Sequence, residues 1–319
     1  MEQKLSVKKI GELIRDNINL VMLIVMIVLG AIISKDFFTI NNLMNLLRRI
    51  TVNGVMAAGF TLTLLVGGFD LSIGSTLSLC AVLCVGIEKS SGSAAIGMLV
   101  AIAAGAAVGL LNGLLMKLTR GESGEAFLIT LGTSMVASSA ALTYCNGYDI
   151  YGVNAKWYKA IGQGNIAGFP IAAIIWLGIL IILQIVIKKT EFGRQLVLSG
   201  ANKKSAFLAG VNVGKMKIIA FTLAGIFAAI AAIIMTARTT AGSPRSGTGA
   251  DFDAAIASII GGNSLVGGKG GMVQVFIGVV IYGLITNMLN LMGVDSVVQY
   301  IVKGVVLLIA ICLDNLKKR

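Results

Sequence analysis

Residues 188–217 read KKTEFGRQLVLSGANKKSAFLAGVNVGKMK, a basic and polar stretch between two long apolar ones. Asn202 can begin a short helix by accepting a hydrogen bond from the backbone N–H of Lys204 or Ser205. Gly210 can end that helix, because glycine tolerates the left-handed conformation of the residue after a helix. We therefore predict a cytoplasmic loop that carries a two-turn helix. It could serve only to orient the chain, as basic loops of membrane proteins do, or it could dock a cytosolic partner.

The composition of the chain around this loop is typical of a protein embedded in a lipid bilayer. Hydrophobic residues make up 56% of the 319 residues and charged residues 13%, against roughly 25% charged in an average soluble domain. Glycine accounts for 40 residues, and Gly105, Gly109 and Gly113 recur at a spacing of four, which lets helix backbones approach closely in a membrane. The chain is predicted to be an all-α polytopic membrane protein.

Apolar stretches that approach the length of a bilayer crossing recur along the chain. We expect about ten transmembrane helices, near residues 18–34, 50–67, 71–87, 94–116, 126–145, 167–187, 217–235, 251–262, 272–292 and 297–313. The second, third and eighth of these spans are short. If the chain starts inside, most of its 26 lysine and arginine residues fall on cytoplasmic segments, which is the asymmetry that sets orientation. Both termini are therefore expected in the cytoplasm.

No stretch outside the spans could form a soluble core, so residues 1–319 are expected to be a single transmembrane domain, with its cytoplasmic loop at about 188–217. Ten spans divide into two halves of five, and an odd number in each half gives the halves opposite orientations in the membrane. The expected architecture is a 5+5 inverted repeat in which some helices are short or broken.

Two glycine-rich segments adjoin the short spans, at places that we take to correspond between the halves. They are GGFDLSIGS at 67–75 and GGNSLVGGKGG at 261–271. Breaks at membrane depth are tolerated where protein or a water-filled cavity satisfies the freed backbone groups, so the pair indicates a translocation path, with tight cytoplasmic turns as the alternative. The glycines concerned are Gly67, Gly68, Gly74, Gly261, Gly262, Gly267 and Gly268.

Asp70 lies in the first glycine-rich segment, next to the hydrocarbon region, where a carboxylate costs about 2.5–3.5 kcal/mol and needs a partner or water. Aspartate at a helix start accepts hydrogen bonds from unpaired N–H groups and suits the helix dipole. We expect it to cap the third span, with substrate contact as the alternative. Other polar residues are candidates either for the path or, more commonly, for hydrogen bonds between helices. These are Asn53, Ser72, Asn112, Asn287 and Asn290.

Catalysis by this chain is not expected. It contains no histidine, which excludes Ser-His-Asp and Cys-His catalysis within one chain. Gly268 and Lys269 match the centre of a phosphate-binding P-loop, but Asn263 replaces the first glycine of that pattern and Gly270 its final Ser or Thr. We therefore expect no metal or cofactor in this chain, and ATP-driven transport would need another chain. The net charge of +12 is spread over span ends, which argues against a nucleic-acid partner.

Several motifs follow one another from about residue 38 to the end of the chain. They are GGFDLSIGS at 67–75, FLITLGT at 127–133, FGR at 192–194, GANKKSAFLAGVN at 200–212, GGNSLVGGKG at 261–270 and NMLNLMG at 287–293. In this order they resemble the inner-membrane permease family of ribose-type ABC sugar importers.

The resemblance implies a ten-helix permease that works as two copies in the bacterial inner membrane and admits a monosaccharide by alternating access. It also implies a cytosolic ATPase subunit, which would hold ATP and magnesium, and an extracytoplasmic sugar-binding protein. The loop between the sixth and seventh spans would carry the coupling helix that docks on the ATPase. Its coupling residues would be Asn202, Ala206, Phe207, Leu208 and Gly210.

Other functions stay open. Permeases for nucleosides and for branched-chain amino acids share the architecture. A secondary transporter would need ionisable groups deep in its spans, whereas Asp70 is nearly the only deep carboxylate that the sequence suggests. A structural membrane protein would need neither the glycine-rich breaks nor the coupling-like loop.

Overall fold

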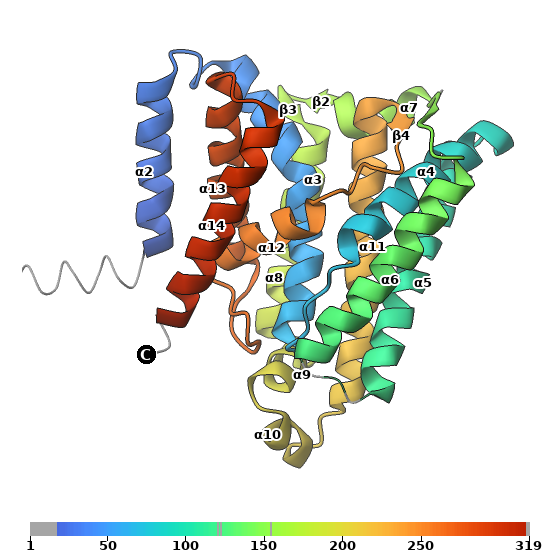
Figure 1. Cartoon of the computed structure of the whole chain (residues 1–319), viewed down its shortest axis with the longest axis vertical. Helices are drawn as coiled ribbons and strands as arrows, with labels where there is room; N and C mark the ends of the chain where they lie inside the picture. The colour runs from blue at the N-terminus through green and yellow to red at the C-terminus, as the bar shows by residue number, and fades with distance from the viewer. Residues whose placement is uncertain (1–17, 120, 122, 154, 317–319) are drawn as a thin grey trace, which may run out of the picture.

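The computed structural model describes residues 18–119, 121, 123–153 and 155–316, and most of them form helices (Figure 1). The longer helices are α2 (Ile18–Ile33), α3 (Ile40–Leu65), α4 (Ile73–Ser91), α5 (Ala94–Leu118), α6 (Ser123–Tyr144), α8 (Ile171–Lys189), α11 (Val213–Thr239), α13 (Met272–Leu291) and α14 (Ser296–Leu316). The shorter ones are α7 (Lys156–Gln163), α9 (Glu191–Ala201), α10 (Lys203–Leu208) and α12 (Ala250–Ile260).

Six of the described helices are long and apolar enough to cross a membrane, namely α4, α5, α6, α8, α11 and α13. α2 and α14 contain shorter apolar segments. Each predicted span overlaps one helix, and the shortness of the eighth is confirmed, because α12 has only 11 residues. The chain is thus a polytopic helical membrane protein.

The helices run between two ends of the molecule. α9 and α10 lie at one end, which we call the α10 end, and α7 lies near the other, the α7 end (Figure 1). Strand β1 (Ile150–Tyr151) pairs antiparallel with β4 (Ala241–Gly242), which ties the loop after α6 to the segment after α11. Strands β2 (Asn165–Ile166) and β3 (Phe169–Pro170) form a second small hairpin.

The core is centred on α11, which packs against α5, α3 and α4. A Cβ atom built on Gly109 would lie 2.9 Å from Thr222 Cα, and one built on Gly113 would lie 2.6 Å from Ile218 Cα. The backbones of α5 and α11 therefore touch along the glycine stripe, and the prediction that these glycines permit close helix packing is confirmed.

The predicted short second span is wrong, because α3 has 26 residues and begins ten residues earlier, at Ile40. Thr39 is its N-cap and accepts a hydrogen bond from the backbone N–H of Asn42. The early part of α3 carries Arg48 and Arg49, so it is too polar to be recognised as an apolar span.

Helices α4 and α12 both begin near mid-height in the molecule (Figure 1). Their starts meet at a glycine contact, since a Cβ atom on Gly74 would lie 2.6 Å from the carbonyl oxygen of Gly247. Two segments therefore reach the middle of the bundle: residues 66–72, which join α3 to α4, and residues 240–249, which join α11 to α12. The first predicted break, 67–75, runs from the α10 end to mid-height, whereas the second, 261–271, stays at the α10 end, so the two predicted breaks do not occupy corresponding positions in the fold.

Candidate functional site

The Asp70 carboxylate is buried just before α4. Its Oδ1 accepts hydrogen bonds from the backbone N–H of Ser72, at 2.8 Å, and from the Ser72 hydroxyl, at 2.6 Å. Ser72 is itself the N-cap residue of α4 and makes no side-chain cap bond. The cap prediction is therefore corrected in this detail: Asp70 orders the turn before the helix and holds the cap residue in place.

The same network continues into two further helices. The side-chain amide of Asn112 on α5 donates to Ser72 Oγ at 2.8 Å, and its oxygen accepts from the hydroxyl of Thr133 on α6 at 2.7 Å. Asp70, Ser72, Asn112 and Thr133 are all buried. The structure places Ser72 and Asn112 in hydrogen bonds between helices, which is the alternative to the translocation path.

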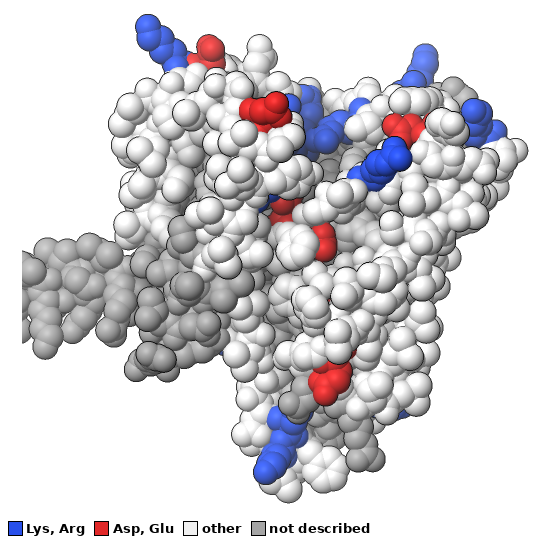
Figure 2. All heavy atoms as spheres, in the orientation of Figure 1, with Lys and Arg blue, Asp and Glu red and all other residues white. Residues whose placement is uncertain are grey.

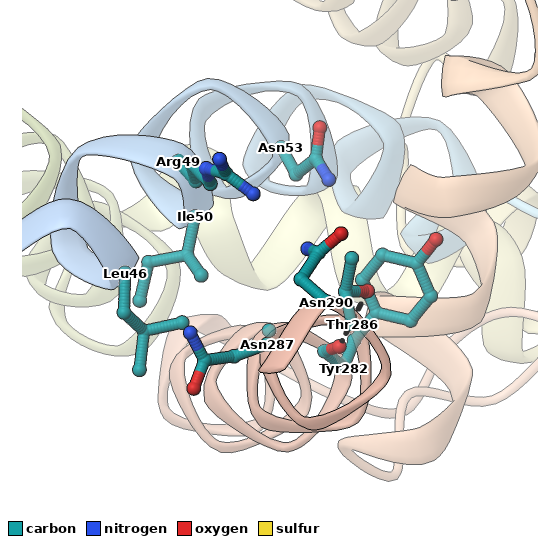
Figure 3. A pocket seen from close by; sticks show the side chains of 9 residues that line it. Leu46, Arg49, Ile50, Asn53, Tyr282, Thr286, Asn287 and Asn290 are labelled. Carbon is teal, nitrogen blue, oxygen red and sulfur yellow. Dashed lines mark hydrogen bonds between the residues drawn. The ribbon is translucent and has the colours of Figure 1, made fainter. Parts of the chain in front are cut away.

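A small pocket of about 50 Å³ lies between α3 and α13 (Figure 3). It is lined by three of the predicted path residues, Asn53, Asn287 and Asn290, and also by Arg49, Tyr282 and Thr286. This volume is enough for a few water molecules.

Two of the three asparagines in the pocket also form side-chain hydrogen bonds that link helices. Asn287 and Asn42 exchange side-chain amide hydrogen bonds of 2.8 and 3.1 Å, which link α13 to α3. The Asn290 oxygen accepts from Gln299 on α14 at 3.1 Å. The pocket therefore brings the predicted path residues Asn53, Asn287 and Asn290 together, whereas Asp70, Ser72 and Asn112 belong to the separate buried network.

A charged cluster that sequence reasoning missed lies where α12, α13 and α14 meet. Asp253 Oδ2 accepts a 2.9 Å hydrogen bond from Lys303 Nζ, and Asp253 Oδ1 accepts one from the hydroxyl of Tyr282. The Lys303 ammonium is 5.7 Å from the ring centroid of Tyr282 and 5.3 Å from that of Tyr300. We call Asp253, Tyr282, Tyr300 and Lys303 the α12–α14 cluster. Together with Asp251, it corrects the expectation that Asp70 is nearly the only deep carboxylate.

Arginines gather at the α7 end. Arg48 donates from Nη2 to the side chain of Asn165 at 2.8 Å, and Arg238 donates from Nη1 to the carbonyl oxygen of Arg48 at 3.1 Å. Among the described side chains, neither arginine forms an ion pair. Figure 2 shows several basic side chains on this end of the molecule, with acidic ones among them. Unneutralised guanidinium groups of this kind suit an acidic partner surface.

The loop at 188–217 contains the predicted two-turn helix, as α10. Asn202 Oδ1 accepts from the backbone N–H of Ser205 at 3.0 Å, and Gly210 adopts φ = +75° after the helix. Phe207 and Leu208 are 78% and 85% exposed.

Ala206 is fully buried against the rest of the chain. Its predicted place at a partner contact is therefore wrong, because a two-turn helix has one face against its own protein. Ala206 packs α10 against the rest of the chain, and the exposed apolar side chains of this helix are Phe207 and Leu208.

Both glycine-rich segments meet beside the C-terminal end of α9, just before α10. The backbone N–H of Gly268 donates to the carbonyl oxygen of Leu65 at 3.1 Å. A Cβ atom on Gly267 would lie 2.9 Å from Gly67 Cα, and one on Gly200 would lie 2.9 Å from Gly268 N. The backbone of α9, which leads directly into α10, therefore touches the segment after α3 and the segment before α13. We call this contact of Leu65, Gly67, Gly200, Gly267 and Gly268 the glycine junction.

The remaining predicted glycines have other roles. Gly261 is the C-cap residue of α12, and Gly278 of α13 lies so close to it that a Cβ on Gly278 would be 2.7 Å from Gly261 N. Gly262 adopts φ = +106° in the turn that follows, and Gly68 packs against Phe221.

Comparison with known proteins places the chain among permeases. Residues 42–311 match the family described as branched-chain amino acid transport system / permease component. The chain is 37% identical over 303 residues to the ribose import permease protein RbsC of Escherichia coli K12, which covers 94% of each chain. It is 36% identical to RbsC of Bacillus subtilis 168, over 92% of this chain and 91% of that one.

A third relative is named for a different sugar. The L-arabinose transport system permease protein AraH of Escherichia coli K12 is 33% identical over 94% of this chain and 90% of its own length. No solved structure matches the chain.

Proposed function

The chain belongs to the permease family of branched-chain amino acid type transport systems, and we propose that it is the membrane-spanning subunit of an ABC importer for ribose or a similar simple sugar. The observation that carries the proposal is the 31–37% identity to ribose import permeases over nearly the whole chain. The chain itself performs no bond chemistry in this proposal. ATP and magnesium belong to a partner ATPase.

The exposed face of α10 supports an ATPase partner. Phe207 and Leu208 are exposed on α10, and Lys203 and Lys204 line the same surface of this short helix. Adjacent exposed apolar side chains on a capped helix are a feature of protein docking sites. A groove in the ATPase that receives them could move α10, and the glycine junction would pass that movement to α3 and α13.

The α7 end supports an extracytoplasmic binding protein as the second partner. Arg48, Arg49 and Arg238 lie at this end without an ion pair among the described residues, and they would attract an acidic surface. With α10 in the cytoplasm, the α7 end faces outward. Both termini then lie in the cytoplasm of a multi-pass bacterial inner-membrane protein.

The third proposed partner is a second copy of the chain. α6 and α14 lie on one face of the molecule, on either side of the mid-height starts of α4 and α12 (Figure 1). Both helices expose apolar side chains, among them Met135 and Val136 on α6 and Ile301 and Val305 on α14.

We propose that the full bundle has ten spanning helices in a 5+5 inverted arrangement, with α2, α3, α12 and α14 added to the six clear candidates.

Uptake by proteoliposomes that contain this chain, its ATPase and its binding protein tests the substrate class. We expect ATP-dependent uptake of labelled ribose, with competition from unlabelled ribose and weaker competition from arabinose or allose. Because the family description mentions branched-chain amino acids, leucine is the comparison substrate, and adenosine represents nucleosides. Uptake of leucine or adenosine in place of ribose would reject the sugar assignment and keep the importer class.

A further inference from the structure

The α12–α14 cluster is a costly arrangement for a membrane protein. Lys303 lies on α14, in the interval 297–313 that the sequence marks as an apolar span, and Asp253 lies in the first turn of α12. A charged side chain at the centre of a bilayer is energetically costly, and such residues usually mark substrate or ion pathways. The pair therefore requires an explanation beyond helix packing.

The cluster is accessible as well as deep. The side chains of Asp253 and Lys303 are 14% and 24% exposed, and Tyr300 is 53% exposed. Figure 2 shows acidic side chains in a hollow near mid-height, at the level where α12 begins in Figure 1. The Tyr300 ring lies beside the segment that leads into α12, since a Cβ atom on Gly249 would be 3.5 Å from Tyr300 Cε1.

Tyr282 connects the cluster to the pocket between α3 and α13. Its hydroxyl bonds Asp253, and its side chain also lines the pocket that contains Asn53 and Asn290 (Figure 3). A ligand that passes from the α7 end toward mid-height along α13 would meet the pocket and then the cluster.

The chemistry of the cluster selects a class of ligand. Asp253 supplies carboxylate oxygens that accept hydrogen bonds, Lys303 supplies ammonium protons that donate them, and Tyr300 supplies an exposed ring face. The charges of Asp253 and Lys303 cancel within the pair, and the nearby Asp251 carboxylate lies in the first turn of α12, where the helix dipole offsets its charge, so the site favours neither an anion nor a cation strongly. A neutral polyhydroxy compound fits best, because each hydroxyl can both donate and accept, and its C–H faces can stack on a ring.

We propose that Asp253 and Lys303, with the ring of Tyr300, form the mid-depth station that holds a neutral polyhydroxy substrate during passage. The proposal rests on the sugar importer function above and names the residues of this chain that touch the sugar. The station replaces hydrogen bonds to water that a sugar loses when it enters the membrane interior.

A purely structural role for the pair makes a different prediction. If the ion pair only ties α14 to α12, two uncharged side chains of similar size should serve equally well, because apolar replacement of a buried ion pair is often neutral or stabilising. A ligand site would lose its charged acceptor and its ammonium donor in the same variant.

The test uses the double variant Asp253→Asn/Lys303→Met in the complete reconstituted complex, with ribose delivered by saturating binding protein. We expect the uptake rate to fall by about tenfold or more, because hydrogen bonds to charged groups are lost, while complex assembly and thermal stability stay near wild type. More ATP should be hydrolysed per ribose transported. Uptake within about twofold of wild type would overturn the proposal and would mean that the ion pair only ties α14 to α12.

Tyr300 gives a test that does not depend on the ion pair. Tyr300→Leu removes an exposed ring and should slow ribose uptake, whereas Tyr300→Phe keeps the ring face and should transport normally. Tyr300→Phe is the matched control, because it changes the same exposed position and keeps the ring. Unchanged uptake by Tyr300→Leu would overturn the station even if the double variant misfolds. Wild-type complex that transports leucine but not ribose would instead reject the proposed substrate class.

Discussion

Gly74 and Gly247 touch backbone to backbone where α4 and α12 begin, so two helix N-termini from opposite halves of the chain meet inside the bundle. Asp251 lies at the same point, because a Cβ atom on Gly74 would also be 3.1 Å from its backbone nitrogen. Positive helix ends and carboxylates thus gather next to the hollow. The contact between Gly74 and Gly247 thus joins the two parts of the chain that reach the middle of the bundle before α4 and α12.

Replacement of Gly74 tests how closely these helix starts must approach. Gly74→Ala would push the new methyl group against Gly247, and we expect a loss of about 1–3 kcal/mol in stability together with reduced uptake. Gly132→Ala is the matched control, because Gly132 is also helical and nothing lies within 4 Å of its added Cβ. The control should be neutral or slightly stabilised in a thermal unfolding assay. Equal behaviour of the two variants would show that the contact is dispensable.

Asp70 is predicted to act through hydrogen bonds more than through its charge. Asp70→Asn keeps an oxygen that can accept from the N–H and hydroxyl of Ser72, so most uptake should remain. Asp70→Leu removes both bonds in a buried site and should cost roughly 0.5–2 kcal/mol or more, with lower uptake. Both proteins should insert normally. If Asn is as damaging as Leu, the carboxylate charge has a function of its own.

The outward face of α10 is predicted to hold the ATPase. Leu208→Ser should weaken co-purification of the ATPase by about tenfold, because a central apolar contact is lost, while stability changes by less than about 0.5 kcal/mol. Leu118→Ser is the control, since Leu118 is 77% exposed at the end of α5. Normal recovery of the ATPase with Leu208→Ser would leave residues 188–217 as a segment that only orients the chain.

The glycine junction is predicted to transmit motion rather than to bind the partner. Gly200→Ala would force α9 away from Gly268 and Leu65, so ATPase binding should persist while ribose uptake per ATP hydrolysed falls. Gly178→Ala on α8 is the control, because its added Cβ meets nothing within 4 Å. Loss of ATPase binding in Gly200→Ala would mean that the junction only shapes the docking site.

Local signals in the sequence located many elements of this fold. The capped helix at 202–210 could be predicted because Asn202 and Gly210 act on their own neighbours. The start of α3 was missed because Arg48 and Arg49 mask a helix whose outer part is polar. The burial of Ala206 could not be derived, since six residues are too few to define a helix face.

The candidate site was harder to predict than the helices. Asp253 and Lys303 are 50 positions apart and Asp253 and Tyr282 are 29 apart, so their contact depends on how α12, α13 and α14 pack. Two local signals of the cluster were present in the sequence: Lys303 inside the apolar interval 297–313, and Asp253 near the start of the predicted span 251–262. Asn112 and Ser72, by contrast, look like path residues in the sequence, and only the fold shows that they bond to each other.

The energy source of uptake tests the central claim most directly. Proteoliposomes with the chain, the ATPase and the sugar-loaded binding protein would be compared with enclosed ATP and magnesium, with ADP, and with an imposed proton or sodium gradient alone. The account predicts ribose uptake only with ATP, unchanged by ionophores that collapse ion gradients, and no ATP hydrolysis by this chain purified alone. Ribose uptake that an ion gradient drives without ATP would contradict it.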